Sequence, residues 1–375
     1  MDQVDVLIIG GGVIGCAIAE RLSRRQREIF LVEQFPRLGM STSSRNSGVI
    51  HSGIYYPTNS WKARTCVAGN PLTKEFCAAH QVSHRTTGKL VVAKSALEES
   101  ALLALQKKGR ENGVENLELL DSRQIRSREP HVVGALALSV PSTGICLAED
   151  LVRAYARVAE TQGAHLLTHA QVLRVDPAPE LLRVTVRIGD EERSETETIE
   201  ARAVINSAGL YSDEVARLLG PRPWKIYPVR GEYCEVRGPR AELVRGLVYP
   251  LPHPDGLTLG LHFTKTLWGS LLLGPTAKYV EGKDNYERDR MTIAGFLEDV
   301  QTLVPDLRAS DLQLAFSGLR PKLVPPGGHG ISDFVLEPDP EFPRVFHLVG
   351  MESPGLTAAP AIANHVSEWV EEVLG

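Results

Sequence analysis

The fold is decided by residues 6–15, which read VLIIGGGVIG, and by residues 29–33, which read IFLVE. The first run is a buried-strand pattern that ends in a glycine-rich turn, and a helix-like run follows it. Gly10 permits the tight turn, Gly12 permits close approach of a pyrophosphate, and Gly15 permits close helix packing. The order of strand, glycines, helix, strand and acid predicts a dinucleotide-binding unit.

The helix after the glycines offers a binding site for phosphate groups. Its first residues, Val13 and Ile14, carry N–H groups that no helix turn satisfies, and the helix dipole favours negative charge there. Glu33 lies 18 residues after Gly15, where a carboxylate can accept hydrogen bonds from ribose hydroxyls, and Gln34 follows it. These residues predict a bound dinucleotide, and the alternative is a Rossmann half that binds nothing.

The composition excludes several classes of protein. A chain of 375 residues suits two domains, and 43% hydrophobic with 23% charged residues is typical of a folded globular protein. The net charge of −5 argues against a nucleic-acid partner. No apolar run reaches the roughly 18 residues that a transmembrane segment needs. Because Lys and Arg are missing ahead of the first apolar run, we expect a cytoplasmic protein that starts near Met1, with attachment at a membrane surface left open.

The cysteines indicate neither a disulfide framework nor a zinc site. Cys16, Cys66, Cys77, Cys146 and Cys234 are scattered, and no Cys-x-x-Cys pair occurs. We therefore expect no metal and interpret each cysteine as a small buried apolar residue.

Three separated stretches of the chain have the pattern of one α/β layer. They are residues 1–80, 148–221 and 335–375, in which apolar strands alternate with helix patterns. The inserts 81–147 and 222–334 differ, and the second holds long β patterns with many Pro and Gly. The sequence predicts one discontinuous nucleotide-binding domain and one substrate domain built from the inserts, with the substrate in the crevice between them.

Individual elements follow from the same patterns. We expect a helix over residues 149–161, a single strand over 164–175, and a C-terminal helix from about Leu356. The β patterns of the second insert are expected over residues 224–236 and 258–274.

The cofactor is expected to be a flavin nucleotide. The glycine fingerprint occurs once, so the chain offers no second nucleotide loop for a nicotinamide. Gly355, Leu356 and Thr357 bring backbone N–H groups to a helix start, which stabilises an anion such as a reduced flavin. Residues 41–48 supply further donors. We predict an α/β fold (α+β, two-domain), with a Rossmann-like FAD-binding domain plus a mixed, β-rich substrate domain.

Residues 44–56, SRNSGVIHSGIYY, closely resemble the flavin loop of the L-2-hydroxyglutarate dehydrogenase/oxidase family, within the D-amino-acid-oxidase-like FAD oxidoreductases. Its part VIHSGIYY is the most discriminating, because the flavin motifs are shared by the wider group. Further similar motifs are spread over almost the whole chain: Lys62-Ala63, Gly88-Lys89-Leu90, AGLYSD at 208–213, RGEY at 230–233, Tyr249-Pro250, GLHFT at 260–264, LGP at 273–275, GLRP at 318–321 and GMESPGLT at 350–357.

The resemblance, together with the glycine fingerprint, implies tight binding of FAD by a large set of residues. They are Gly10, Gly12, Val13, Ile14, Gly15, Glu33, Gln34, Ser43, Ser44, Arg45, Asn46, Ser47, Gly48, Val172, Ala208, Gly209, Gly350, Ser353, Gly355, Leu356 and Thr357. Val172 is included because relatives touch adenine through the backbone at this strand position. Many relatives carry His in place of Arg45, and no cysteine lies beyond Cys234. The resemblance therefore implies that FAD is bound non-covalently.

Oxidation of an α-hydroxy acid requires a base for the hydroxyl proton and transfer of the Cα hydride to flavin N5. Histidine suits this base near neutral pH. His51 directly follows the flavin loop and His262 lies in a β pattern of the substrate domain, so both are candidates, the alternative for each being a structural imidazole. His347 lies in an apolar strand and is expected to be a hydrogen-bonded core residue.

Arg320 is the candidate for binding the substrate carboxylate. A guanidinium matches a carboxylate with two parallel hydrogen bonds, and Gly and Pro neighbours make its loop rigid. A second carboxylate would need another donor. Tyr249, Thr264 and Arg230 are candidates, and the sequence does not choose among them.

Three functions are compatible with these patterns. The first is FAD-dependent oxidation of an L-2-hydroxy acid, and the resemblance implies conversion of L-2-hydroxyglutarate to 2-oxoglutarate. The second is an amino-acid or amine oxidase of the same group, which residues 51–56 disfavour. The third is a non-catalytic flavoprotein subunit, which His51, His262 and Arg320 disfavour. The electron acceptor, oxygen or a quinone or electron-transfer partner, is left open.

Overall fold

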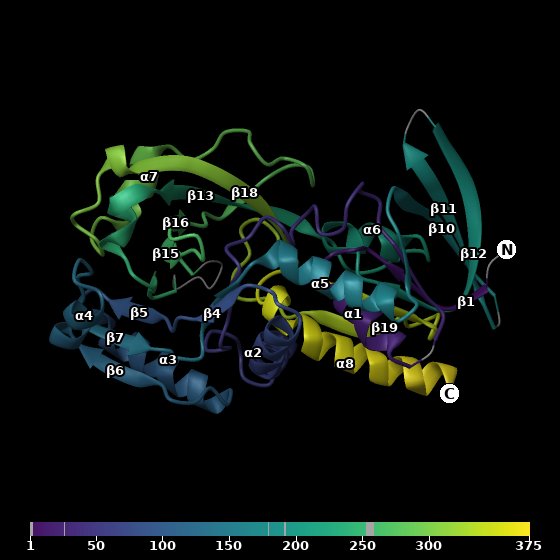
Figure 1. Cartoon of the computed structure of the whole chain (residues 1–375), viewed down its shortest axis with the longest axis horizontal. Helices are drawn as coiled ribbons and strands as arrows, with labels where there is room; N and C mark the ends of the chain where they lie inside the picture. The colour runs from purple at the N-terminus through teal and green to yellow at the C-terminus, as the bar shows by residue number, and fades with distance from the viewer. Residues whose placement is uncertain (1–2, 26, 179, 191–192, 253–258) are drawn as a thin grey trace.

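The computed structural model describes residues 3–25, 27–178, 180–190, 193–252 and 259–375. The molecule is elongated and has two halves (Figure 1). In one half, helices α1, α5 and α8 cover a sheet that contains β1 and β12, and in the other half a second sheet contains β13 and β18.

Within the described residues, the first sheet has eight strands and is built around β1. β1 pairs in parallel with β2 and with the end of β12, while β9 and β20 extend the parallel part on its two sides. β10 and β11 form an antiparallel ribbon with the start of β12, and β19 pairs with β20. The strands are β1 (Gln3–Ile9), β2 (Ile29–Val32), β9 (His165–Leu167), β10 (Ala170–Pro177), β11 (Leu182–Asp190), β12 (Arg193–Asn206), β19 (Val335–Pro338) and β20 (Val345–Val349).

Helices cover this sheet because each has a continuous apolar face. In α1, the buried residues Ile14, Ile18 and Leu22 recur every four positions, so they share the face that packs on the core. α1 lies against α5 and α8, and α2 also packs on α8. The helices of this half are α1 (Val13–Ser23), α2 (Trp61–Ala79), α5 (Ala148–Thr161), α6 (Ser212–Arg217) and α8 (Gly355–Leu374).

The second sheet has nine strands in the part of the chain that the structure describes. Eight of them follow the order β17-β13-β16-β15-β14-β5-β7-β6, and β18 pairs with β13. Its strands are β5 (Leu90–Ala93), β6 (Glu118–Asp121), β7 (Leu136–Ser139), β13 (Tyr227–Val236), β14 (Leu247–Pro250), β15 (His262–Lys265), β16 (Leu271–Gly274), β17 (Lys278–Tyr279) and β18 (Leu312–Lys322). Helices α3 (Glu99–Glu111), α4 (Ser122–Arg128) and α7 (Ile293–Val300) accompany it. Short 3₁₀ turns are η1 (Ala96–Glu98), η2 (Gly209–Tyr211), η3 (Gly238–Leu243) and η4 (Ala309–Asp311).

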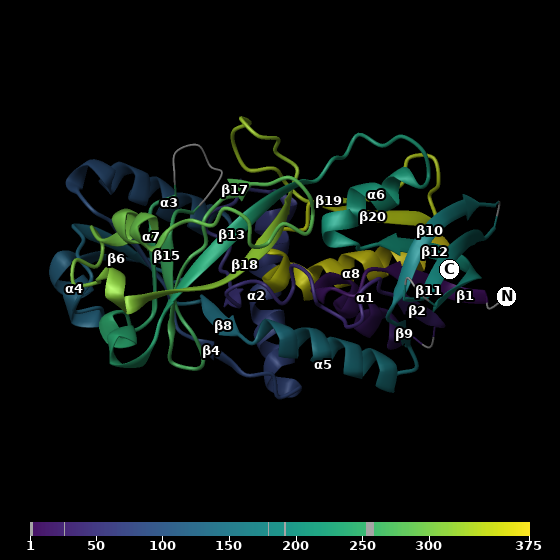
Figure 2. The same ribbon diagram turned by 90° about the horizontal axis from the view of Figure 1, so that it is seen from above.

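A small sheet and two long strands connect the halves. The small sheet contains β3 (Val49–Ile50), β8 (Gly144–Cys146) and β4 (His84–Thr86). Figure 2 shows β13 and β18 reaching from the second sheet toward the start of α8. This arrangement brings the end of β18, the loop before β3 and the start of α8 into one region.

Two expected strands are divided in the structure. Residues 164–175 form β9 and the start of β10, because the chain turns at His169, whose φ is +53°. The described part of residues 258–274 holds the hairpin β15–β16, with a turn at Gly269. None of the helices within the described residues is both long and apolar enough to cross a membrane. The proposed domain boundaries stay a prediction.

Candidate active site

A cavity with two lobes extends from the first sheet toward the second half of the molecule. The lobes share Gly12, Thr42, Ser43, Ser207 and Gly209, so they lie next to each other. We call the lobe lined by Glu33, Gln34, Val172 and Ala208 the Glu33 lobe. We call the lobe lined by His51, Tyr249, His262 and Arg320 the Arg320 lobe.

The glycine-rich turn lies where the lobes meet. Gly10 has a φ of +107°, and a Cβ there would lie 2.6 Å from the Ser207 carbonyl oxygen. A Cβ on Gly15 would lie 2.0 Å from the Gly10 carbonyl oxygen, so α1 packs on this turn only with glycine at that position. Gly12 is the N-cap of α1 and supplies no side-chain cap, and the Ser43 hydroxyl accepts the Val13 N–H at 2.9 Å.

Glu33 directly follows β2 and lines the Glu33 lobe. One carboxylate oxygen accepts the Gly11 N–H at 2.7 Å and the other accepts the Phe35 N–H at 2.9 Å. Burial raises the pKa of the Glu33 carboxyl, although these backbone donors act to lower it. A carboxylate has about four lone-pair sites, so Glu33 can hold the glycine turn and still accept ribose hydroxyls.

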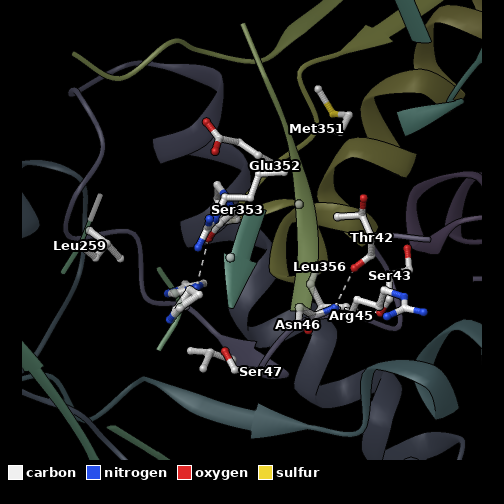
Figure 3. A pocket seen from close by; sticks show the side chains of 18 of the residues that line it. Thr42, Ser43, Arg45, Asn46, Ser47, Leu259, Met351, Glu352, Ser353 and Leu356 are labelled. Carbon is white, nitrogen blue, oxygen red and sulfur yellow. Dashed lines mark hydrogen bonds between the residues drawn. The ribbon is translucent and has the colours of Figure 1, made fainter. Parts of the chain in front are cut away.

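The loop of residues 41–48 lines both lobes, and hydrogen bonds from its own side chains to its backbone hold its shape. The Asn46 amide donates to the Thr42 and Ser43 carbonyls, and its oxygen accepts the Gly48 N–H at 2.8 Å. The Arg45 guanidinium lies 4.3 Å from the centre of the Tyr286 ring. In Figure 3, Thr42, Ser43 and Arg45 lie on the opposite side of the view from Leu259.

The start of α8 also faces the Arg320 lobe, in which Ser353, Gly355 and Leu356 line the wall. The N-cap residue Pro354 makes no side-chain hydrogen bond to the helix. The buried Thr357 hydroxyl accepts the His51 N–H at 2.9 Å, so this helix fixes the backbone that carries His51.

Most of the residues expected to bind FAD line this cavity. They are Gly10, Gly12, Val13, Ile14, Glu33, Gln34, Ser43, Arg45, Asn46, Ser47, Val172, Ala208, Gly209, Ser353, Gly355 and Leu356. The remaining five are not among the lining residues: Gly15, Ser44, Gly48, Gly350 and Thr357. Two helix starts without side-chain caps from their N-cap residues thus face one elongated cavity, which suits a ligand with a pyrophosphate and an anionic ring.

His51 and His262 both line the Arg320 lobe. The His51 Nε2 lies 3.2 Å from the Ser353 hydroxyl, and its buried Nδ1 has no hydrogen-bond partner among the residues described. The His262 Nδ1 lies 2.8 Å from the Gly260 carbonyl oxygen. Burial, and then the charges of Lys89 and His262, hold the pKa of His51 well below its usual value. Burial lowers the pKa of His262 to about 3.

Arg320 projects from β18 into the same lobe. Its Nη1 donates to the Thr276 carbonyl oxygen at 2.9 Å. A Cβ on Gly231 would lie 2.7 to 2.9 Å from the guanidinium, so the glycine of the RGEY motif gives Arg320 room to lie flat. Anchored in this way, the guanidinium can present its remaining N–H groups to a carboxylate.

The structure does not bring Arg230 and Thr264 to the cavity wall. The Arg230 side chain is fully buried, and its guanidinium donates to Glu232, to Asn285 and to the Asp289 carbonyl. Because its donors are engaged by the protein, we do not retain it as a substrate ligand. Thr264 is buried behind Tyr249, which does line the lobe.

Several lining residues had no role in the sequence analysis. Lys62, Lys322 and Glu352 form a buried cluster in which the Glu352 carboxylate lies 2.8 Å from the Lys62 Nζ and 3.1 Å from the Lys322 Nζ. Burial opposes the charge of Glu352, but the two lysines hold its pKa below the usual value. The position of Lys322, two residues after Arg320 on one strand, could have signalled that both point to the same face.

Comparison with known proteins agrees with this geometry. The FAD dependent oxidoreductase family matches residues 5–369. The chain belongs to this family. The chain is 32% identical to the L-2-hydroxyglutarate dehydrogenase of Escherichia coli (strain K12), covering 99% of this chain and 94% of that protein. It is 30% identical to the mitochondrial L-2-hydroxyglutarate dehydrogenase of Homo sapiens, covering 98% and 89%.

Solved structures confirm the predicted fold. The L-α-glycerophosphate oxidase of Mycoplasma pneumoniae, solved with FAD bound, superposes with a TM-score of 0.87 at 26% identity, covering 99% of this chain and 95% of that one. A glycine oxidase from Geobacillus kaustophilus has a TM-score of 0.82 at 23% identity, covering 99% and 95%. The α/β fold, the resemblance stated from the sequence and FAD as cofactor are therefore confirmed.

Proposed function

We propose that this FAD-dependent oxidoreductase oxidises L-2-hydroxyglutarate to 2-oxoglutarate. The observation that carries the proposal is the placement of Arg320, His51 and His262 in one lobe, beside the helix start expected to face the flavin. Relatives named for this reaction match nearly the whole chain, which supports the same conclusion.

The residues of the Arg320 lobe have separate roles in the proposed reaction. FAD, when bound, supplies the acceptor for the Cα hydride at flavin N5. Arg320 holds the carboxylate next to the reacting carbon and so fixes the orientation of the substrate. A neutral histidine, His51 or His262, takes the hydroxyl proton as the carbonyl forms. The apolar wall, which includes Leu259, Met351 and Leu356, excludes water from the site.

The two histidines differ in which ring nitrogen can carry the proton. The Gly260 carbonyl can only accept a hydrogen bond, so His262 carries its proton on Nδ1 and leaves Nε2 as a base. The Ser353 hydroxyl can donate or accept, so His51 can adopt either tautomer. Both rings are neutral near pH 7 because burial opposes their charged forms.

We also propose that FAD is bound without a covalent bond. Arg45, which takes the place of a histidine found in many relatives, has a guanidinium engaged by the Tyr286 ring. Acid precipitation of the purified protein tests this proposal. We expect the yellow colour to stay in the supernatant, and colour retained in the pellet would contradict non-covalent binding.

Anaerobic titration separates the three functions that the sequence leaves open. We expect L-2-hydroxyglutarate to bleach the flavin band, while L-glutamate and glycine leave it unchanged. Bleaching by the amino acids alone would instead assign an amino-acid oxidase. A flavin that no substrate reduces would assign a non-catalytic subunit. The electron acceptor, either oxygen or a quinone-type partner, is a separate question that oxygen consumption with and without a quinone analogue answers.

A further inference from the structure

Lys89 is a buried cation whose charge no described residue balances. It lies just before β5, is 3% exposed, and its ammonium nitrogen has no hydrogen-bond partner in the described part of the chain. It lies 4.3 Å from the centre of the Tyr55 ring and 4.7 Å from that of Tyr249. Burial of an unpaired ammonium costs more free energy than contacts with two ring faces contribute.

The other buried cations in the described residues are paired. Lys62 and Lys322 share the Glu352 carboxylate, Lys265 pairs with Glu242, and Arg230 pairs with Glu232. Lys89 therefore differs from them in having no carboxylate beside it. The consequence appears in its pKa, which burial lowers to about 7. An anion that enters from the cavity would restore the balance that the other sites already have.

Two potential hydrogen-bond donors, the hydroxyls of Tyr55 and Tyr249, belong to rings that lie beside Lys89 and line the cavity. Tyr55 and Tyr249 line the Arg320 lobe, and their buried hydroxyls make no hydrogen bond of normal geometry to a described residue, although the Thr264 hydroxyl lies near that of Tyr249. Tyr249 also stacks on His262, with ring centres 3.7 Å apart, so its position is fixed relative to the candidate base. Buried hydroxyls without partners are rare, and a bound carboxylate would satisfy both of them.

We propose that Tyr55, Tyr249 and Lys89 form the subsite for the second carboxylate of a dicarboxylate substrate whose first carboxylate binds Arg320. The two hydroxyls donate to this carboxylate, and Lys89 supplies the opposite charge from behind the rings. The inference rests on the proposed function and deepens it, because it assigns the selection of a diacid to residues on β14 and just before β5. The Lys62–Glu352–Lys322 cluster is the weaker candidate, because its lysines already share a carboxylate.

Binding of two five-carbon acids to the FAD-loaded protein tests the subsite without turnover. Glutarate has two carboxylates and pentanoate has one, and neither carries the hydroxyl group that is oxidised. Titration followed by the flavin absorbance should show that the unmodified protein prefers glutarate. In Lys89→Met we expect glutarate affinity to fall by about 10- to 100-fold, and pentanoate affinity to change by less than about threefold.

Conservative variants keep the test valid if Lys89→Met fails to fold. Tyr55→Phe and Tyr249→Phe keep both rings, so each should lower the glutarate preference by about 3- to 10-fold. Tyr155→Phe is the matched control, because Tyr155 also has a buried hydroxyl without a partner among the described residues but lies in α5, away from the cavity. Its glutarate preference should stay unchanged.

The outcomes separate this inference from the proposed function. Equal losses for glutarate and pentanoate, or an unchanged glutarate preference in all three subsite variants, would overturn the subsite. A protein that prefers glutarate through Lys89 and yet is not reduced by L-2-hydroxyglutarate would keep the subsite and refute the proposed reaction. A protein reduced by L-2-hydroxyglutarate whose diacid preference does not depend on Lys89 would do the reverse.

Discussion

The two lobes of the cavity differ in how their polar groups are satisfied. In the Glu33 lobe, both Glu33 carboxylate oxygens already accept backbone N–H groups, and the Ser43 hydroxyl accepts the N–H of Val13 at the start of α1. In the Arg320 lobe, the His51 Nδ1 and the hydroxyls of Tyr55 and Tyr249 have no partner in the described residues. The first lobe is built before its ligand arrives, whereas the second has hydrogen-bonding capacity that a ligand must complete.

This difference indicates which residues should tolerate substitution. The Glu33 lobe is expected to bind the nucleotide part of FAD mainly through backbone groups. Most side-chain substitutions there should therefore leave the chemistry intact. In the Arg320 lobe, the proposed reaction depends on Arg320, His51 and His262, which come from distant segments of the chain. Single substitutions of these residues should alter turnover while FAD stays bound.

Replacement of the catalytic base should have the largest effect. We expect one of His51→Ala and His262→Ala to slow anaerobic flavin reduction by about 10²- to 10⁴-fold, because the hydroxyl proton loses its acceptor. The other variant should act mainly on KM, and both should retain FAD. Stopped-flow reduction by L-2-hydroxyglutarate measures both effects, and the exposed His165→Ala is the control. Rapid reduction in both variants would remove histidine as the base.

Arg320→Lys should weaken substrate binding by a smaller factor. Lysine keeps the positive charge but loses the planar pair of donors, so KM should rise by about 10- to 100-fold. FAD content should not change, because Arg320 lies outside the Glu33 lobe and the glycine turn. The control is Arg126→Lys, on the exposed face of α4. If FAD is lost as well, Arg320 contacts the cofactor and the division between the lobes fails.

Glu33→Ala should affect the cofactor alone. Loss of its hydrogen bonds to ribose and to the Gly11 N–H should weaken FAD binding by about 1.5–3 kcal/mol, or about 10- to 100-fold. Reconstitution of the apoprotein with FAD measures this change, and the exposed Glu28→Ala is its control. The ratio of rates for different hydroxy acids should remain that of the unmodified protein. Unchanged FAD affinity would show that Glu33 does not bind the ribose.

The same contrast explains what could be predicted from the sequence. The glycine turn, Glu33 and the 41–48 loop depend on contacts within a short stretch of backbone, so a local motif predicts them. His347 was also predicted correctly as a core residue, because it lies within an apolar strand. In the structure it is buried, and its ring forms hydrogen bonds with Asn206 and Asp339. Arg320, His51 and His262 were proposed because their residue types suit the chemistry. The structure brings them into one lobe, and their roles stay predictions.

The partners of the buried charges could not be predicted. Lys62 meets Glu352 across 290 residues of chain, and Lys89 meets Tyr249 because β14 pairs with β5. One partner of Arg230 is the nearby Glu232, but Asn285 and the Asp289 carbonyl reach it from a loop 55 and 59 residues away, and no local pattern predicts those contacts. Such contacts follow from strand order, which the sequence patterns did not specify.

The smallest effect concerns pH. Burial, followed by the charge of Lys89, holds the pKa of His51 well below 6.5, and His262 titrates near 3. The base is therefore neutral at pH 6.5, and kcat/KM should stay high as pH falls through 6.5 and decline only at lower pH. In Lys89→Met a positive charge is removed, so protonation of histidine becomes easier and the midpoint of the decline should move up by less than about one pH unit.

The position of that midpoint separates electrostatics from binding. A weaker substrate complex lowers kcat/KM at every pH but leaves the midpoint in place, whereas a change in the field at the histidine moves it. The profile should be measured with L-2-hydroxypentanoate, which carries one carboxylate and so does not depend on the proposed second subsite. A midpoint that stays fixed in Lys89→Met would show that Lys89 does not set the charge state of the base. A decline that begins above pH 6.5 in the unmodified protein would mean that the proton acceptor is not a buried neutral histidine, and the contrast between the lobes would then rest on substrate binding alone.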